Sequence, residues 1–317
     1  MSVQTATGPV AADALGPTLM HEHVFTLDSE VLALDPGWDE EAAITDATAR
    51  LAELRGRGIT TIVDLTVIGL GRFVERIRRV AEQSGMQIVV ATGIYTFSEM
   101  PQYFKIRSQL LSPDFVEEFF IREAREGIGP GGILPGILKC ATDRFGLVMD
   151  VEHVLRATAR AHTKTGLPIS THTHAKSKQG LTQQRIFQEE GVDLSKVVIG
   201  HSGDTTDLEY LEQLIDNGSY LGMDRFGIDV FCPFEGRVAT VAELCRRGYA
   251  ERMVLSHDAS CVSHSVPPEL LDQPRWTRWR YTHISDDVLP ALRKAGVPEE
   301  DLTTMLVANP RRILDRG

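Results

Sequence analysis

The chain has 317 residues, of which 42% are hydrophobic and 24% charged, and its formal net charge is −11. A chain of this size and composition can bury a core without disulfides or metal staples, and its acidic balance disfavours a nucleic-acid partner or an anionic membrane surface. The four scattered cysteines have no Cys-x-x-Cys spacing, which predicts reduced thiols. We expect neither a leader peptide nor a membrane span, and therefore a cytoplasmic protein.

Short β-branched segments alternate with amphipathic ones along the whole chain, at a spacing of about 30 residues. An apolar stretch before His21 predicts the first strand, and seven more strands are predicted at 59–66, 87–93, 136–140, 168–172, 197–201, 220–225 and 253–258. Helices are predicted between them at 38–56, 71–85, 113–127, 149–166, 179–191, 207–218 and 237–248. Eight such units favour an α/β fold of the (β/α)8 TIM-barrel type, forming a single domain over residues 1–317, and no Gly-x-Gly-x-x-Gly supports a dinucleotide fold.

The stretch Leu19-Met20-His21-Glu22-His23 is the first candidate for chemistry. Side chains alternate along an extended backbone, so His21 and His23 point to the same side. Two imidazoles aimed at one point are typical of a metal site, because histidine is the commonest metal ligand. An ordinary polar strand end remains an alternative for this pair alone.

The later strand ends supply more side chains of the same kind. In a barrel of this type the active site lies at the carboxyl ends of the strands, where the chain places Lys139, His172, His201 and Asp258. With the first two histidines, these make six potential ligands on one rim. His257 alternates away from Asp258 and is expected to support the site from behind.

Lys139 is predicted to be buried within the strand 136–140. Burial of an unpaired ammonium is costly, so the lysine either reaches a salt-bridge partner or has a depressed pKa. A neutral amine could add carbon dioxide to form a carbamate, which is an anionic ligand with two oxygens that could bridge two divalent cations. Both interpretations stay open on the residues alone.

These motifs together resemble the amidohydrolase superfamily, and more closely the phosphotriesterase family. The resemblance rests on Leu19 to His23, on Gly136-Ile137-Leu138-Lys139-Cys140, on Ser170 to His174 and on Ser256-His257-Asp258, and it extends to Asn309-Pro310-Arg311. Within the family the chain is most similar to the phosphotriesterase-like lactonases, some of which hydrolyse N-acyl-homoserine lactones and so quench quorum signals.

The resemblance implies a binuclear metal centre. It implies an α-metal held by His21, His23 and Asp258, and a β-metal held by His172 and His201, with carboxylated Lys139 and a hydroxide bridging the two ions. Such sites take zinc, and related enzymes also use cobalt, manganese or iron. A homodimer is implied as well.

The mechanism expected from this ligand set is hydrolysis by the bridging hydroxide, with Asp258 as the proton shuttle. Tyr95 and Arg225 match lactonase positions that touch the substrate, here a lactone with an apolar acyl chain. The alternatives are rim packing for Tyr95 and an ion pair with Asp224 or Asp229 for Arg225.

The segment 259–283 is long for a loop and rich in apolar and aromatic residues, which suits either a substrate lid or a subunit interface. It departs from the family pattern, so substrate choice is least certain to carry over. Alternatives are a phosphotriesterase or an amide or ester hydrolase on the same metals, possible weak phosphotriesterase activity beside lactone hydrolysis, or a catalytically silent metal-bearing binding protein. A serine hydrolase is excluded because Gly200-His201-Ser202-Gly203-Asp204 lacks the last glycine of Gly-x-Ser-x-Gly.

Overall fold

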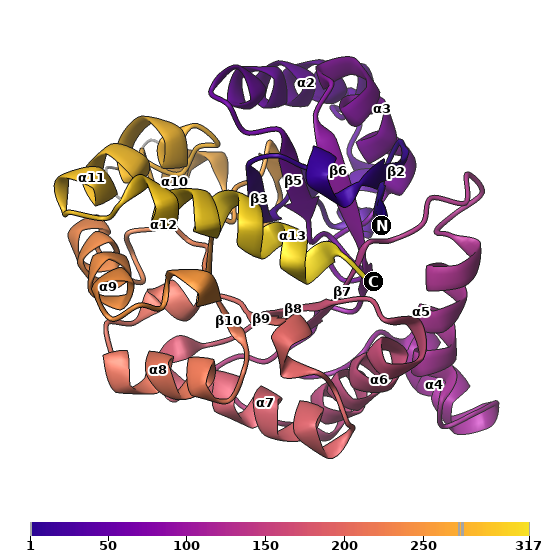
Figure 1. The fold of residues 1–317 in the computed structure, drawn as a ribbon. Helices are drawn as coiled ribbons and strands as arrows, with labels where there is room; N and C mark the ends of the chain where they lie inside the picture. Colours follow the sequence, from indigo (N-terminus) through magenta and orange to yellow (C-terminus); the bar gives the residue numbers. More distant parts are fainter. Residues whose placement is uncertain (1, 272, 274–275, 317) are drawn as a thin grey trace.

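The computed structural model describes residues 2–271, 273 and 276–316, and it has eight parallel strands at its centre (Figure 1). The strands pair in the order β11-β10-β9-β8-β7-β6-β5-β3. Their bounds are β3 Thr18–Glu22, β5 Thr61–Asp64, β6 Gln87–Gly93, β7 Ile137–Ala141, β8 Ile169–His172, β9 Val197–Ile199, β10 Tyr220–Met223 and β11 Met253–Leu255. Every predicted strand is present, and each is buried on both faces, as a parallel sheet covered by helices requires.

Helices separate the strands and form the outer layer of the molecule (Figure 1). They are α1 Ser29–Leu34, α2 Glu40–Gly56, α3 Val74–Ser84, α4 Gln102–Leu110, α5 Phe115–Glu126, α6 Met149–Thr165, α7 Gln179–Glu189, α8 Leu208–Asp216, α9 Phe234–Arg246, α10 Pro268–Leu271, α11 Leu289–Lys294, α12 Glu299–Thr303 and α13 Asn309–Leu314. Gly85 and Gly166 end α3 and α6 in the left-handed conformation, which glycine adopts readily because it has no side chain. The predicted TIM barrel is confirmed.

The first and last strands of the barrel meet through contacts at their carboxyl ends. The amide of Asp258 donates to the carbonyl of His21 at 3.1 Å, and the amide of His21 donates to Ser256 Oγ at 2.8 Å. This seam brings the first and last predicted ligands side by side, although they are more than two hundred residues apart in the chain.

Four predicted strands end earlier than expected, at Asp64, Ile199, Met223 and Leu255. After two of these ends the backbone soon adopts an unusual conformation. His201 has a φ of 59° and Asp258 a φ of 56°, so the chain leaves the extended conformation at each of these residues. The left-handed region is unfavourable for residues with a Cβ, and such strain is commonly found at functional sites.

Several small elements were not predicted from the sequence. A hairpin of β1 (Ser2–Thr5) and β2 (Gly8–Ala11) precedes the barrel, and β4 (Phe25–Thr26) pairs with β12 (Val262–Ser263). The helix α4 lies in a stretch that looked like a plain connection. The remaining short helical turns are η1 Ala12–Ala14, η2 Ala175–Ser177, η3 Leu194–Lys196, η4 Ser202–Asp204, η5 Ala250–Arg252, η6 Ile284–Val288 and η7 Thr304–Ala308.

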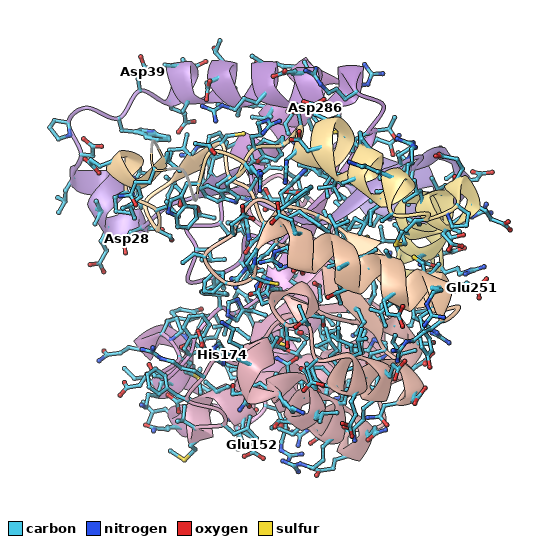
Figure 2. The ribbon with its side chains drawn as sticks, turned by 90° about the vertical axis from the view of Figure 1, so that its left-hand side faces the viewer. Asp28, Asp39, Glu152, His174, Glu251 and Asp286 are labelled. Atoms are coloured by element: carbon cyan, nitrogen blue, oxygen red, sulfur yellow. The ribbon has the colours of Figure 1, made fainter. Side chains whose placement is uncertain are left out.

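The two ends of the barrel differ in what covers them. At the amino-terminal end of the strands, α13 crosses the barrel close to both chain termini (Figure 1), and its buried Ile313 and Leu314 belong to one apolar cluster with Leu15 and Met20. Figure 2 shows Glu251, which precedes β11, on the opposite side of the molecule from Asp28 and His174, which follow strand ends. The carboxyl-terminal end carries the segments that follow the strands.

Within the described residues, all four cysteines are free and buried, as predicted for reduced thiols. No helix in this part of the chain is long and apolar enough to cross a membrane.

Candidate metal centre

A cavity of about 210 Å³ opens at the carboxyl ends of the strands. All eight residues predicted for the site line this cavity, which are His21, His23, Tyr95, Lys139, His172, His201, Arg225 and Asp258. The barrel brings them together because they come from different strands, apart from the first two; Lys139 lies within β7, and the later residues end or follow their strands. Their separate roles stay predictions.

His21, His23 and Asp258 form the first group within the cavity. One carboxylate oxygen of Asp258 lies 3.2 Å from His23 Nε2 and 3.5 Å from His21 Nε2. Burial opposes ionisation of Asp258, but His21, His23 and Arg225 outweigh it and hold the pKa of that carboxyl well below its usual value. The carboxylate is therefore charged at neutral pH and faces two imidazole nitrogens, as a ligand should.

His172 and His201 form the second group. The Nε2 atom of His201 lies 2.8 Å from Nδ1 of His172, so the two rings point to the same spot. Burial lowers the pKa of His172 to about 3 and that of His201 well below its usual value. Both imidazoles are then neutral, which is the form that binds a metal.

Lys139 lines the cavity next to the first group. It is 1% exposed, and its Nζ is 3.2 Å from His21 Nε2. Burial is the main cause that lowers its pKa, to about 8, against the opposing effect of Asp258 and Asp224. A neutral amine is thus accessible near physiological pH, and the prediction of an activated lysine agrees with this environment.

The donor set fits divalent metal ions. The ligand atoms of His21, His23 and Asp258 all lie within 4.8 Å of one another. Neutral imidazoles and a carboxylate are the donors that zinc and similar ions take in proteins. Buried imidazole nitrogens with free lone pairs need a partner, and a cation held between them and the Asp258 carboxylate would supply it.

Glu22 supports Asp258 from behind the site. One oxygen of Glu22 accepts from the backbone amide of His257 at 2.9 Å and from His257 Nδ1 at 2.8 Å, and the other accepts from the amide of Ala259 at 2.9 Å. The Glu22 carboxylate thus accepts hydrogen bonds from the backbone on both sides of Asp258, the residue with a left-handed φ. The expectation that His257 supports the site from behind agrees with this geometry.

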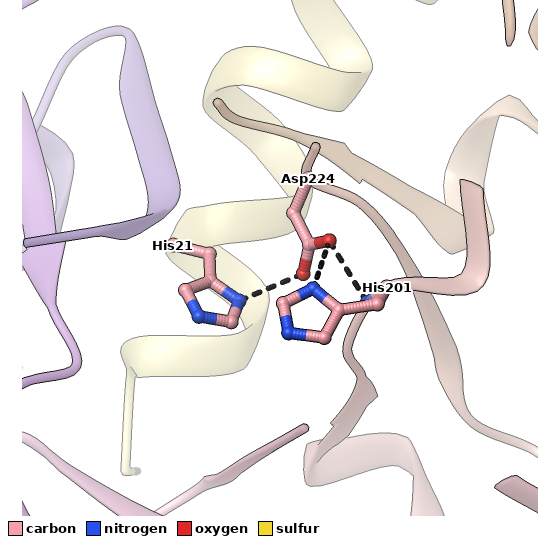
Figure 3. A group of neighbouring side chains, drawn as sticks. All are labelled: His21, His201 and Asp224. Atoms are coloured by element: carbon pink, nitrogen blue, oxygen red, sulfur yellow. Dashed lines mark hydrogen bonds and ion pairs between the residues drawn. The ribbon is translucent and has the colours of Figure 1, made fainter. Parts of the chain in front are cut away.

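Asp224 is the site residue that sequence reasoning missed. Its fully buried carboxylate lies between His21 and His201 and contacts both rings (Figure 3). In the sequence it appeared only as a possible partner of Arg225. The signal that could have found it is Gly222, two residues earlier in β10, whose missing side chain leaves room for the carboxylate.

Arg225 and Tyr95 stand at the side of the cavity. Arg225 donates from Nε to Asp258 at 2.9 Å and from Nη1 to Asp204 at 3.0 Å. The alternative predicted from the sequence, an ion pair of Arg225 with Asp224 or Asp229, is not formed among the described residues. Burial raises the pKa of Tyr95, whose hydroxyl lies 3.4 Å from His172 Nδ1 and remains protonated as a donor.

The segment 259–283 forms part of the cavity wall, through Val266, Trp276 and Trp279. Trp279 Nε1 donates to the carbonyl of Asp258 at 2.9 Å, and Tyr281 is buried with its hydroxyl bonded to the carbonyl of His23. The lid interpretation agrees with this placement, while the interface interpretation stays a prediction. Pro274, one of the prolines of this segment, lies outside the described residues.

Known proteins resemble this chain over its whole length. The Phosphotriesterase family model matches residues 1–314. A phosphotriesterase homology protein of Mycobacterium tuberculosis is 56% identical over 319 residues, which cover 99% of this chain and 98% of that protein. A solved structure of the phosphotriesterase from Mycobacterium tuberculosis has a TM-score of 0.97 at 55% identity, covering 100% of this chain and 99% of that one. Another, in which organophosphate hydrolysis was engineered from a weak promiscuous lactonase template, has a TM-score of 0.91 at 36% identity and covers 99% and 100%.

Proposed function

This chain belongs to the phosphotriesterase family, and on that premise we propose that it opens the ring of lactones, with N-acyl-homoserine lactones as the substrate class. It is a hydrolase that acts on ester bonds, as its family and its relatives establish. A lactone is a cyclic ester, so opening its ring is hydrolysis of an ester bond.

The observation that carries the proposal is the division of the cavity into two chemically different parts. The floor holds the histidines, Lys139 and Asp258, whereas the loops after the strands contribute apolar side chains to the wall. These are Leu70, Ile228, Phe231, Val266, Trp276 and Trp279. A compact polar ring with an apolar chain attached matches such a cavity, because the ring reaches the ligands while the chain covers the apolar wall.

Two divalent ions would be held by His21, His23 and Asp258 on one side and by His172 and His201 on the other, with Lys139 as a carbamate between them. When bound, such ions acidify water and polarise a carbonyl oxygen. Zinc suits the imidazole-rich donor set, and cobalt, manganese and iron are the alternatives.

Asp258 is placed to accept the proton that the attacking water releases. Its carboxylate is ionised at neutral pH and is oriented on both oxygens, by His23 Nε2 and by Arg225 Nε. From this position the proton can pass to the ring oxygen that leaves as an alkoxide, so the aspartate acts first as base and then as acid.

Arg225 and Tyr95 supply hydrogen-bond donors rather than proton transfer. The pKa of Arg225 is raised by Asp204 and Asp258 despite its burial, so the guanidinium keeps its charge throughout. Its two bonds to these aspartates use two of five N–H donors, which leaves others to orient an ester or amide oxygen.

A phosphotriester is the second candidate substrate. Two of the similar solved structures are described through phosphotriesterase or organophosphate hydrolysis. The same metals and base would serve, since both reactions place negative charge on an oxygen beside the metals. We rank it second because the apolar wall suits a long acyl chain.

A substrate panel on metal-defined protein tests the proposal. The apoprotein is reconstituted with zinc, cobalt or manganese, and kcat/KM is measured for acyl-homoserine lactones of increasing chain length, for γ- and δ-lactones and for an aryl phosphotriester. We expect chelator-sensitive lactone hydrolysis, with the acyl lactones ahead of the phosphotriester by at least tenfold. Equal rates on both classes, or phosphotriester hydrolysis alone, would overturn the proposed substrate class.

A further inference from the structure

We propose that Asp224 is a positioning residue that couples the two halves of the metal centre, by fixing one histidine of each half through one of its two oxygens. This inference rests on the ligand assignment of the proposed function, but not on the identity of the substrate.

The geometry of the carboxylate is symmetrical with respect to the two rings. Oδ2 lies 2.8 Å from His21 Nδ1, and Oδ1 lies 2.9 Å from His201 Nδ1 (Figure 3). The two rings stack with their centroids 4.8 Å apart. Asp224 itself is 0% exposed, so no water competes for these contacts.

These contacts determine which nitrogen of each ring is available to a metal. A carboxylate only accepts hydrogen bonds, so both Nδ1 atoms carry the proton and both Nε2 atoms keep a free lone pair. The Nε2 atoms are the ones that face the cavity, His21 toward Lys139 at 3.2 Å and His201 toward His172 at 2.8 Å. Asp224 therefore fixes both the tautomer and the direction of each ring.

Asp224 also fixes the strained backbone of His201. The amide of His201 donates to Oδ1 at 2.8 Å, the same oxygen that accepts from its ring. Because His201 has a φ of 59°, its backbone would otherwise relax toward a commoner conformation and turn the ring away.

The surrounding chain leaves space for this carboxylate. A Cβ on Gly222 would lie 2.5 Å from Asp224 Oδ2 and 3.0 Å from the Cα of Gly200. A side chain at position 222 must therefore displace Asp224 or its neighbour. This gives a second way to disturb the carboxylate, one that leaves its charge unchanged.

The observed distances favour positioning over direct metal binding by Asp224. Distances of 2.8 to 2.9 Å between its oxygens and the Nδ1 atoms are those of hydrogen bonds between the groups. A backbone amide occupies one oxygen as well. Histidine ligands in proteins commonly donate their second N–H to a carboxylate in this manner, and loss of that partner costs about 10- to 100-fold in metal affinity.

The test compares Asp224→Asn, Gly222→Ala, Asp150→Asn and Gly56→Ala. Asp150 is a buried carboxylate that pairs with the amide of Met100 and with Lys105, away from the cavity, and a Cβ on Gly56 meets no atom within 4 Å. Metal affinity is measured on the full-length protein by competition of zinc with a chelating indicator. Cobalt-substituted protein gives the visible absorption of each ion, and the melting temperature of the metal-free protein gives the effect on folding alone.

We expect Asp224→Asn to weaken both metal positions by about 10- to 100-fold and to change the cobalt spectrum, because an amide can accept from only one of the two rings in the same way. Gly222→Ala should also weaken metal binding, and the controls Asp150→Asn and Gly56→Ala should bind metal like the wild type. Unchanged affinity at both positions, loss at one position only, or an equal loss in Asp150→Asn would overturn the proposal. If Asp224→Asn does not fold, the metal affinity of Gly222→Ala is the test, and an unchanged affinity of that variant would overturn the proposal. Failure of the lactone panel would leave these metal measurements unaffected.

Discussion

The floor and the wall of the cavity are built in different ways. On the floor, buried carboxylates hold the ligand residues from behind, Asp224 for His21 and His201, and Glu22 for the backbone around Asp258. The wall depends on the segment 259–283, where the pairing of β12 with β4 is two residues long and Leu271 is exposed. The floor is held by buried carboxylates, whereas the wall is formed largely by one long segment that hydrogen bonds and a short strand pairing attach to the barrel.

We expect the floor to determine metal binding and turnover, and the wall to determine which substrate is preferred. A change on the floor should alter metal binding and turnover for every substrate alike. A change on the wall should alter which substrate is preferred and leave the metals in place. The bond from Trp279 Nε1 to the carbonyl of Asp258 is one place where the two regions touch.

The largest effect is expected from Lys139→Ala, on the floor. The substitution removes the group that we propose to bridge the metals. We therefore expect kcat/KM to fall by more than about 100-fold for lactone and phosphotriester alike. This exceeds the loss that follows when a residue that only hydrogen-bonds to a metal ligand is removed. Metal content per chain is measured with the activity. Lys178→Ala, which removes a lysine paired with Asp207 at the surface, serves as the control. A Lys139→Ala protein with two metals and full activity would contradict the bridging role.

Arg225→Met should have the next largest effect, because Arg225 touches both the base and the open part of the cavity. The variant loses the donor to Asp258, while Asp204 keeps its bond from Arg237 at 2.7 Å. We expect a drop of roughly 10- to 100-fold in kcat for lactones, about 1.4 to 2.7 kcal/mol, with unchanged metal content. The control is Arg278→Met, which breaks the pair with Asp229 instead. A change in KM alone would show that Arg225 binds substrate without assisting the base.

Substitutions in the wall should sharpen the contrast. Val266→Ala and Trp276→Phe each remove apolar area from the wall of the cavity. We expect KM for long-chain acyl lactones to rise by about tenfold in either variant, from a loss on the order of 1 kcal/mol, with metal content and kcat unchanged. Loss of metal from either variant would show that wall and floor are not separate.

The last prediction concerns stability and not activity, and it involves His283 at the end of the segment 259–283. Burial lowers the pKa of His283 to about 4, and its Nε2 has no partner among the described residues. The unfolded chain takes up this proton near pH 6.5 and the folded one only near pH 4, so the contribution is complete above pH 6.5 and is lost as the pH falls toward 4.

The loss from His283 can reach about 3 kcal/mol, since each pH unit between the two pKa values is worth about 1.4 kcal/mol. Urea unfolding of the metal-free protein at pH 7 and at pH 4.5 measures it. His283→Gln should lose less stability between these pH values than the wild type, while His264→Gln, at an exposed position, should match the wild type. Equal losses in all three proteins would contradict the assignment.

The sequence was a good guide to the floor because strand ends in a barrel have fixed positions. A histidine or lysine at the end of an apolar β-branched stretch points to one rim, and all eight predicted residues line one cavity. Asp224 was missed because its role depends on two rings from other strands, which only the folded barrel brings to it.

Other features could not be read from local pattern. The left-handed backbone of His201 and Asp258 carries no signal in residue type, because both are side-chain-bearing residues in a conformation that usually favours glycine. The helix α4 buries only Phe104, so its apolar periodicity is weak, and the pairing of β12 with β4 joins segments that lie far apart in sequence.

Anomalous diffraction from crystals of the zinc-loaded protein, recorded on both sides of the zinc absorption edge, tests the binuclear floor most directly. We predict two zinc peaks, one contacting His21, His23 and Asp258 and the other contacting His172 and His201, with additional density joined to Lys139 Nζ between them. A single peak, or two peaks beside an unmodified Lys139, would contradict the metal centre proposed for this chain.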